Sequence, residues 1–297
     1  MNKILILLYT LIFSFNCYSS NNEIISVEPS TTLTRSLKKS YETFIERTIN
    51  ARTKNAAAIQ AYILTQKAQG KNVDLIAVFG SDFSSSDFSN FYFSGIDLRN
   101  LDLSKSKFDY SNLEEIDFSS SNLSNCTFRA SDMSFAILNK VNLKNAHLEL
   151  AELTGAMLIE ANLSNADLRG ANLQGANLTS ANLQGANLQG ANLTNAVLSF
   201  ANFDNANLLN ANLSQSTNYK TTYKNSILDK ANFYKARLIN SNLTRASLKH
   251  TNFRRADLRL SSFKNTELEN SSFKRSRVSG VAHDFPEQNF TQEDSNE

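Results

Sequence analysis

The chain has 297 residues, of which 41% are hydrophobic and 20% charged, so it can bury a sizeable core and is not globally disordered. A formal net charge of +2 argues against a protein that binds polyanions over its whole surface. Nine Gly, two Pro and no Trp are fewer than a fold with many tight turns ordinarily uses, so this chain must turn by another device.

Residues 1–20 are predicted to be a secretory signal peptide. Lys3 precedes the apolar run 4–15, and small polar residues end the segment at Ser19 and Ser20. The run is shorter than the about 20 apolar residues of a membrane span. We therefore expect cleavage near Ser19 or Ser20, export to the periplasm or the medium, and no transmembrane helix in the mature chain.

One of the two cysteines, Cys17, allows an alternative interpretation of this segment as a lipoprotein signal. Cys17 would be the acylated first residue if the segment were a lipoprotein signal, although Ser14-Phe15-Asn16 fits that pattern poorly. After either cleavage Cys126 is the one internal cysteine that remains, so no intramolecular disulfide framework is possible. Cys126 is predicted to be a small buried hydrophobe.

Residues 21–75 are predicted to form a helical cap. Apolar residues recur at helical spacing between Thr32 and Gln69, and Gly70 stops the pattern, which indicates one long helix or two. Such a cap would cover the open edge of the first repeat, which would otherwise invite aggregation. A docking surface is the functional alternative.

From Phe83 to Val278 a large apolar side chain returns at every fifth position, and the phase never slips across 40 units. A small side chain usually lies two residues earlier, as at Ala161 and Ala246, and only Asn218 is polar at the large position. Such a fixed period is the signature of a repeat architecture.

The five-residue period excludes both an α-helix and a continuous β-strand in this region. Five residues rotate a helix by about 500°, so the leucines would scatter around it. In a continuous strand an odd period places every second leucine on the opposite face. Three extended residues (inward small, outward polar, inward large) followed by two corner residues satisfy the pattern, so the chain must coil around its own core as a solenoid.

Residues 161–195, which begin Ala161-Asn162-Leu163-Ser164-Asn165, closely resemble the pentapeptide-repeat family, whose consensus is Ala-Asp/Asn-Leu-x-x. The resemblance covers about residues 81–279. It implies an all-β solenoid, a right-handed quadrilateral β-helix with four pentads per coil, in a domain spanning 76–280. Ten coils at about 4.8 Å each would give a rod of about 50 Å, with residues 20 apart stacked.

Two segments depart from the consensus. Residues 216–224 place Asn218 inward with Tyr219 and Tyr223 nearby, which predicts a bulge or a distorted coil. Residues 281–297 are acidic and carry no helical pattern, so we expect a flexible tail. Its residues Phe285 and Phe290 would fold over the last coil or meet a second copy in a dimer.

The sequence does not predict an enzyme, a cofactor or a metal site. His147, His250 and His283 are the only histidines, each at a polar position, and no two share a spacing typical of metal ligands or a catalytic triad. The Gln-Gly-Ala-Asn units occupy corner positions rather than a phosphate-binding loop.

Stacked aspartates supply the best argument for catalysis. With 20-residue coils Asp97 lies above Asp117, and Asp82 above Asp102. Closely held like charges raise one pKa and would suit acid/base chemistry or a bound cation, which gives the alternative of a polysaccharide-active enzyme. The structural interpretation is that these are the exposed consensus Asp residues of the family.

Charge is distributed unevenly along the repeats. Residues 81–160 hold 12 acidic and six basic side chains, whereas residues 220–277 hold four acidic and 14 basic ones. The 20-residue spacing gathers seven of these cations along one predicted basic edge: Lys235, Arg237, Arg254, Arg255, Lys274, Arg275 and Arg277. One interpretation of these cations is that they are solvated surface charge, which is the simplest. Another is that the acidic tail folds onto the basic edge and neutralises it, and a third is that the edge binds a partner.

The sequence thus predicts an exported, non-catalytic scaffold that binds a protein or an anionic surface through the basic edge. No aromatic residues interleave the cations for base stacking, so nucleic acid is not the expected partner. The family resemblance gives the alternative of a DNA mimic that binds DNA gyrase. The signal segment and the lack of a strongly acidic rod oppose that alternative.

Overall fold

The computed structural model describes residues 16–18, 24–26 and 56–284, in two compact units divided between Phe79 and Gly80. In the first unit strands β1 (Asn16–Tyr18) and β2 (Ile24–Ser26) pair antiparallel. Helices α3 (Ala56–Ala68) and α4 (Leu75–Phe79) follow. Strand β1 falls within the predicted signal peptide, whereas the rest of that segment and residues 32–55 of the helical region predicted over 32–69 lie outside the described residues.

Helix α3 ends where the sequence predicts. Gly70 adopts a φ of 63° and the N–H of Lys71 donates to the carbonyl of Gln66 at 2.9 Å, which is a Schellman closure. Asp74 then caps α4, because its carboxylate accepts the N–H of Ala77 at 2.9 Å. The ring of Tyr62 packs edge-on against Phe79, 5.7 Å away, and joins the two helices within this unit.

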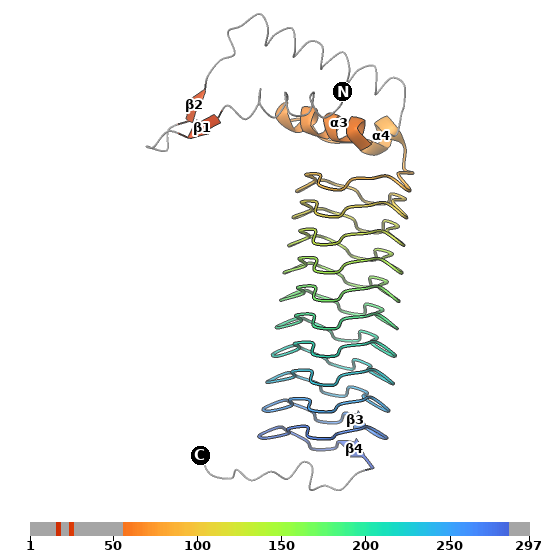
Figure 1. Ribbon diagram of the computed structural model, residues 1–297, viewed down its shortest axis with the longest axis vertical. Helices are drawn as coiled ribbons and strands as arrows, with labels where there is room; N and C mark the ends of the chain where they lie inside the picture. Colours follow the sequence, from red (N-terminus) through yellow and green to blue (C-terminus); the bar gives the residue numbers. More distant parts are fainter. Residues whose placement is uncertain (1–15, 19–23, 27–55, 285–297) are drawn as a thin grey trace, which may run out of the picture. The chain divides into compact units, whose positions relative to one another are not determined.

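The second unit is a solenoid whose register repeats every 20 residues (Figure 1). Parallel bridges join each outward residue to the one 20 positions later, from Asp82↔Asp102 to Asp257↔Arg277. Strands β3 (Ser262–Phe263) and β4 (Ala282–His283) extend the same register by one residue each. Four pentads therefore make one coil.

Each pentad satisfies its backbone within the stack. In the unit Ala161–Asn165, Asn162 donates to the preceding coil and Leu163 and Asn165 donate to the following one, at 2.7–3.0 Å. The N–H of Ala166 closes the corner onto the carbonyl of Leu163. Because neighbouring coils pair so regularly, the wall needs no long strands.

The corners explain how a chain with few Gly and Pro can turn so often. The second corner residue has a left-handed φ in every coil, for example 57° at Asn165 and 61° at Arg275. Outward Asn and Asp side chains support the turn, as when Asn162 accepts the N–H of Ser164 at 3.1 Å. Backbone pairing between coils compensates the modest cost of this φ in non-Gly residues.

The core is a set of side-chain columns parallel to the stacking direction. Leucines and alanines fill its centre and are almost fully buried. Aromatic rings stack near both ends: Phe88, Phe108 and Phe128 have centroids 5.2 and 5.0 Å apart, and Phe253 lies 5.1 Å from Phe273. A continuous dry core of this kind holds each coil against its neighbours.

The prediction of a distorted coil over 216–224 is wrong. Thr217 and Thr222 keep the regular register, and Asn218 is fully buried in the place of a leucine. Tyr223 donates its hydroxyl to the Asn218 carboxamide oxygen at 2.6 Å, and Asn218 donates to Ser216 Oγ at 2.8 Å. Because these partners satisfy the amide, the backbone has no need to bulge.

The predicted tail begins later than residue 281. Strand β4 pairs with β3, and both carboxylate oxygens of Asp284 accept the N–H of Asn265, at 3.0 and 2.8 Å. Residues 281–284 therefore continue the last coil. Residues 285–297, with Phe285 and Phe290, lie outside the described residues.

Candidate functional site

The predicted basic edge is assembled along one corner of the solenoid. The N–H of Lys235 donates to the carbonyl of Arg254, and the N–H of Arg255 donates to that of Lys274, which stacks the three corner pairs. Six of the seven predicted cations are exposed, and Lys274 is half-buried. Five form no ion pair with any residue that the structure describes: Lys235, Arg237, Arg254, Arg255 and Arg275.

Arg237 and Arg277 lie on the adjoining face rather than at the corner, and Asp257 separates them. Arg277 approaches Asp257 at 3.9 Å, whereas Arg259 forms the tighter pair at 2.7 Å. The hydrogen bond from the Arg259 side chain lowers the pKa of the Asp257 carboxyl, so this group stays ionised. The negative charge of Asp257 thus offsets part of the positive charge on the face. The corner itself is therefore the most basic part of the predicted edge.

The stacked aspartates are present, but their surroundings differ from those that catalysis requires. Asp97 and Asp117 bridge as predicted, and the Arg99 guanidinium lies 2.6 Å from Asp97 and 3.5 Å from Asp117. The hydrogen bond from Arg99 lowers the pKa of Asp97, so the expectation of a raised pKa is wrong for this carboxyl. A general acid near neutral pH needs the opposite shift.

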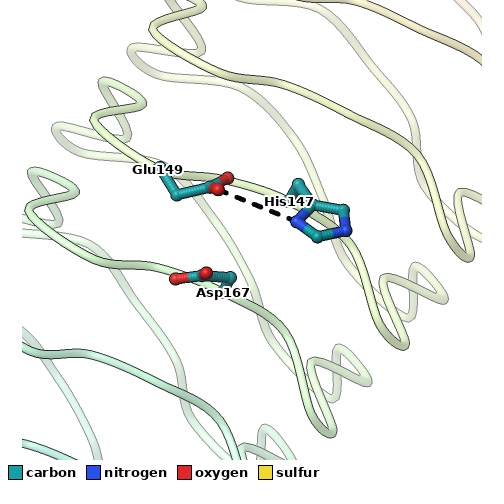
Figure 2. Close-up of side chains that lie close together, drawn as sticks. All are labelled: His147, Glu149 and Asp167. Atoms are coloured by element: carbon teal, nitrogen blue, oxygen red, sulfur yellow. Dashed lines mark ion pairs between the residues drawn. The ribbon is translucent and has the colours of Figure 1, made fainter.

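A second charged cluster joins three consecutive coils. Figure 2 shows its members His147, Glu149 and Asp167. One Glu149 oxygen lies 3.3 Å from Arg129, 3.4 Å from Arg169 and 3.7 Å from His147. Arg169 also pairs with Asp167 at 2.7 Å. Sequence reasoning missed this cluster because it compared the histidines only with one another, although Arg129, Glu149 and Arg169 are spaced by 20.

This cluster brings together three groups that could ligate a metal, since atoms of His147, Glu149 and Asp167 lie within 4.8 Å of one another. The arginines, however, already neutralise both carboxylates, and a cation would have to compete with guanidinium groups at close range. The arrangement fits an ion-pair network that ties adjacent coils together better than a cation site.

Cys126 behaves as predicted. It is a free, fully buried thiol at a small inward position, and its S–H donates to the carbonyl of Leu103 at 2.9 Å. Burial raises the pKa of this thiol to about 12, which leaves it protonated and unreactive at neutral pH. Among the helices that the structure describes, none is long and apolar enough to cross a membrane.

One face of the solenoid carries an unexpected pattern along its length, and we call it the graded face. Its outward residues, in stacking order, are Asp97, Asp117, Ile137, Met157, Asn177, Val197, Thr217, Arg237, Asp257 and Arg277. The basic-edge corner borders it on one side, and a second corner that includes Phe200 and Tyr219 borders it on the other. The face is acidic at one end, mostly apolar in the middle, and carries two arginines with one aspartate between them at the other end.

The sequence model for pentapeptide repeats matches eight copies in this chain, within residues 79–114, 111–149, 136–175, 146–185, 181–217 and 241–280. The chain belongs to the pentapeptide-repeat family. Pentapeptide-repeat proteins form right-handed quadrilateral β-helices and are generally non-enzymatic structural or binding proteins. The resemblance is therefore confirmed, and the bridges between residues 20 apart confirm the coil size that it implies.

A solved structure agrees with this membership, and a second similar one is given beside it. HetL, a pentapeptide repeat protein involved in heterocyst differentiation regulation from the cyanobacterium Nostoc sp. strain PCC 7120, is 27% identical, with 74% of this chain and 94% of that chain covered and a TM-score of 0.56. QnrB1, a plasmid-mediated fluoroquinolone resistance protein, is 20% identical over 67% of this chain and 89% of its own, with a TM-score of 0.28. No curated protein matches the chain.

Proposed function

We propose that the protein is an exported, non-catalytic scaffold whose basic edge binds an acidic partner. One observation carries the proposal: five exposed cations of this edge form no ion pair with any described residue. Stacking like charges about 4.8 Å apart costs stability, and an acidic partner would relieve that repulsion. A rigid wall holds these charges in fixed positions, which lowers the entropy cost of binding.

The finer features of the scaffold belong to the same proposal. They are a ten-coil rod, a helical cap formed by the region before the repeats, and an acidic C-terminal tail. We include no cofactor and no catalytic residue, since the pairing of Asp97 with Arg99 opposes acid/base chemistry there. A DNA-mimic role would need a dominant acidic face, whereas the graded face ends in Arg237 and Arg277.

Binding to immobilised poly-glutamate tests the edge. The variant Arg254→Gln/Arg255→Asn/Arg275→Asn keeps residues that tolerate the corner φ and removes three charges. We expect its affinity to fall about tenfold, since each exposed contact contributes up to about 1 kcal/mol.

A matched control removes the same charge from another corner, with Lys224→Gln/Arg245→Asn/Lys264→Gln. These three side chains are also exposed. We expect the control to lose much less affinity than the edge variant at equal salt. Equal losses in the two variants would show that only net charge matters, and would reject the basic edge as a binding site.

Export is tested by mass spectrometry of the mature N-terminus after fractionation of cells that express the full chain. We expect a chain that begins near Ser20 or Asn21, in the periplasm or the medium. An acylated Cys17 would instead make the protein a membrane-anchored lipoprotein. An intact Met1 in the cytosol would contradict export and make gyrase binding the next test.

A further inference from the structure

The graded face and the two corners beside it carry exposed apolar side chains. Eleven large hydrophobic side chains are exposed among the described residues, and six of them lie on this face or its two corners: Phe135, Met157, Val197, Phe200, Tyr219 and Leu260. Met157 and Val197 point outward from the face itself, with 39% and 36% of their surfaces exposed. A group of exposed apolar residues bordered by charges is typical of a protein interface.

The same corner that becomes basic at one end is acidic at the other. Glu115 and Lys235 occupy the same corner position, six coils apart, with φ values of 56° and 59°. On the face beside them, Asp117 and Arg237 are also six coils apart. Asn177 lies midway between these two layers, three coils from each.

Acidic and basic residues thus lie at equal distances on the two sides of the Asn177 layer. We propose that the partner of the graded face is a second, antiparallel copy of the chain. A two-fold axis through the Asn177 layer, perpendicular to the stacking direction, places each layer of one copy opposite its mirror layer in the other. Asp117 then faces Arg237, and Met157 faces Val197. The basic-edge corner faces itself, so Glu115 of each copy meets Lys235 of the other.

Charge selects this arrangement over the other face-to-face dimer. In a parallel pair every layer would lie opposite the same layer, so that Asp117 would face Asp117 and Arg237 would face Arg237, which is repulsive. In the antiparallel pair the outer layers place Asp97 opposite Asp257. These two carboxylates already have guanidinium partners at 2.6 and 2.7 Å, respectively, so their approach is tolerated.

The size of the face indicates a weak dimer. Eight coil spacings separate Asp97 from Asp257, which gives a length of about 38 Å, and three extended residues give a width of about 10 Å. This flat strip is smaller than the about 800 Å² that each partner buries in a standard interface. We therefore expect a dimer that dissociates on dilution or in high salt.

The dimer deepens the proposed function, because Lys235 and Arg237 belong to the basic edge. Sedimentation equilibrium of the full mature chain at low salt measures the association. We expect Glu115→Lys and Lys235→Glu each to weaken it at least about fivefold, since each substitution alters both symmetry-related contacts. Mixing the two variants should restore association, because every altered pair is then attractive again.

Lys230→Glu is the matched control. Lys230 is exposed and occupies the same corner position with a φ of 59°, but it lies at a corner that does not border the graded face. We expect this variant alone to dimerise like the unaltered chain. Its heterodimer with Glu115→Lys keeps one repulsive contact between positions 115 and 235, so we expect this heterodimer to be weaker than the one that Glu115→Lys forms with Lys235→Glu. An equally tight heterodimer would show non-specific charge attraction and overturn the proposal.

Solution X-ray scattering of the dimer provides an independent measurement. A side-by-side pair keeps the maximum dimension near that of the monomer, whereas an end-to-end pair through the C-terminal coil nearly doubles it. A doubled length, or a monomer at all concentrations, would overturn the antiparallel dimer. Neither result would affect the basic-edge proposal, which the poly-glutamate measurement tests separately with Arg254, Arg255 and Arg275.

Discussion

Phe128→Ala is expected to reduce the free energy of unfolding by about 3–5 kcal/mol. The ring is fully buried, stacks at 5.0 Å on Phe108 and meets Phe118 edge-on at 6.4 Å. Each coil contacts only its neighbours, so the cavity cannot be filled by collapse of a distant part of the core. Urea titration followed by circular dichroism measures the loss.

Phe135→Ala is the control for this substitution, because Phe135 is 56% exposed at a corner seven residues away. Its ring covers the backbone of Gly155, where an added Cβ would lie 2.7 Å from ring carbons. We expect a loss below about 1 kcal/mol for this exposed ring. Similar losses of stability at the two positions would contradict the conclusion that the buried ring of Phe128 stabilises the fold more than the exposed ring of Phe135 does.

The repeat was predictable because its signal is redundant. The inward position was read from 40 units at once, so the single polar exception at Asn218 left the phase intact. The period alone does not predict the number of pentads per coil, since a five-residue period is compatible with several coil sizes. Only the family resemblance supplied the 20-residue coil, which the bridges then confirmed.

The wrong or missing predictions concern side chains that have a polar or charged partner close in space. Considering each residue by itself hides such partners. A polar residue at a core position predicts strain only if its hydrogen bonds are unmet, and Tyr223 at the next large position meets one of them. The Arg129–Glu149–Arg169 column was likewise derivable from the 20-residue spacing, once that spacing was known. The same spacing predicts the basic edge, and it equally places Asp257 between Arg237 and Arg277.

The Asn218–Tyr223 pair should show strong coupling in a double-mutant cycle. Tyr223→Phe leaves the Asn218 carboxamide oxygen buried without its 2.6 Å donor, and Asn218→Leu leaves the Tyr223 hydroxyl buried without an acceptor. Each change is expected to cost about 1–3 kcal/mol, because a buried polar group then lacks its partner. Urea titration of the four proteins gives the coupling free energy.

The double variant Asn218→Leu/Tyr223→Phe should recover most of the loss, since it restores the apolar pattern that surrounds both sites. Leu198 and Leu238 occupy the layers on either side of Asn218, and Phe203 stacks on Tyr223 at 5.0 Å. Ser216 keeps an acceptor after Asn218 is removed, because its hydroxyl donates to the carbonyl of Leu213 at 2.6 Å. Additive losses in the double variant would show that the two polar groups stabilise this coil independently, through contacts other than their shared hydrogen bond.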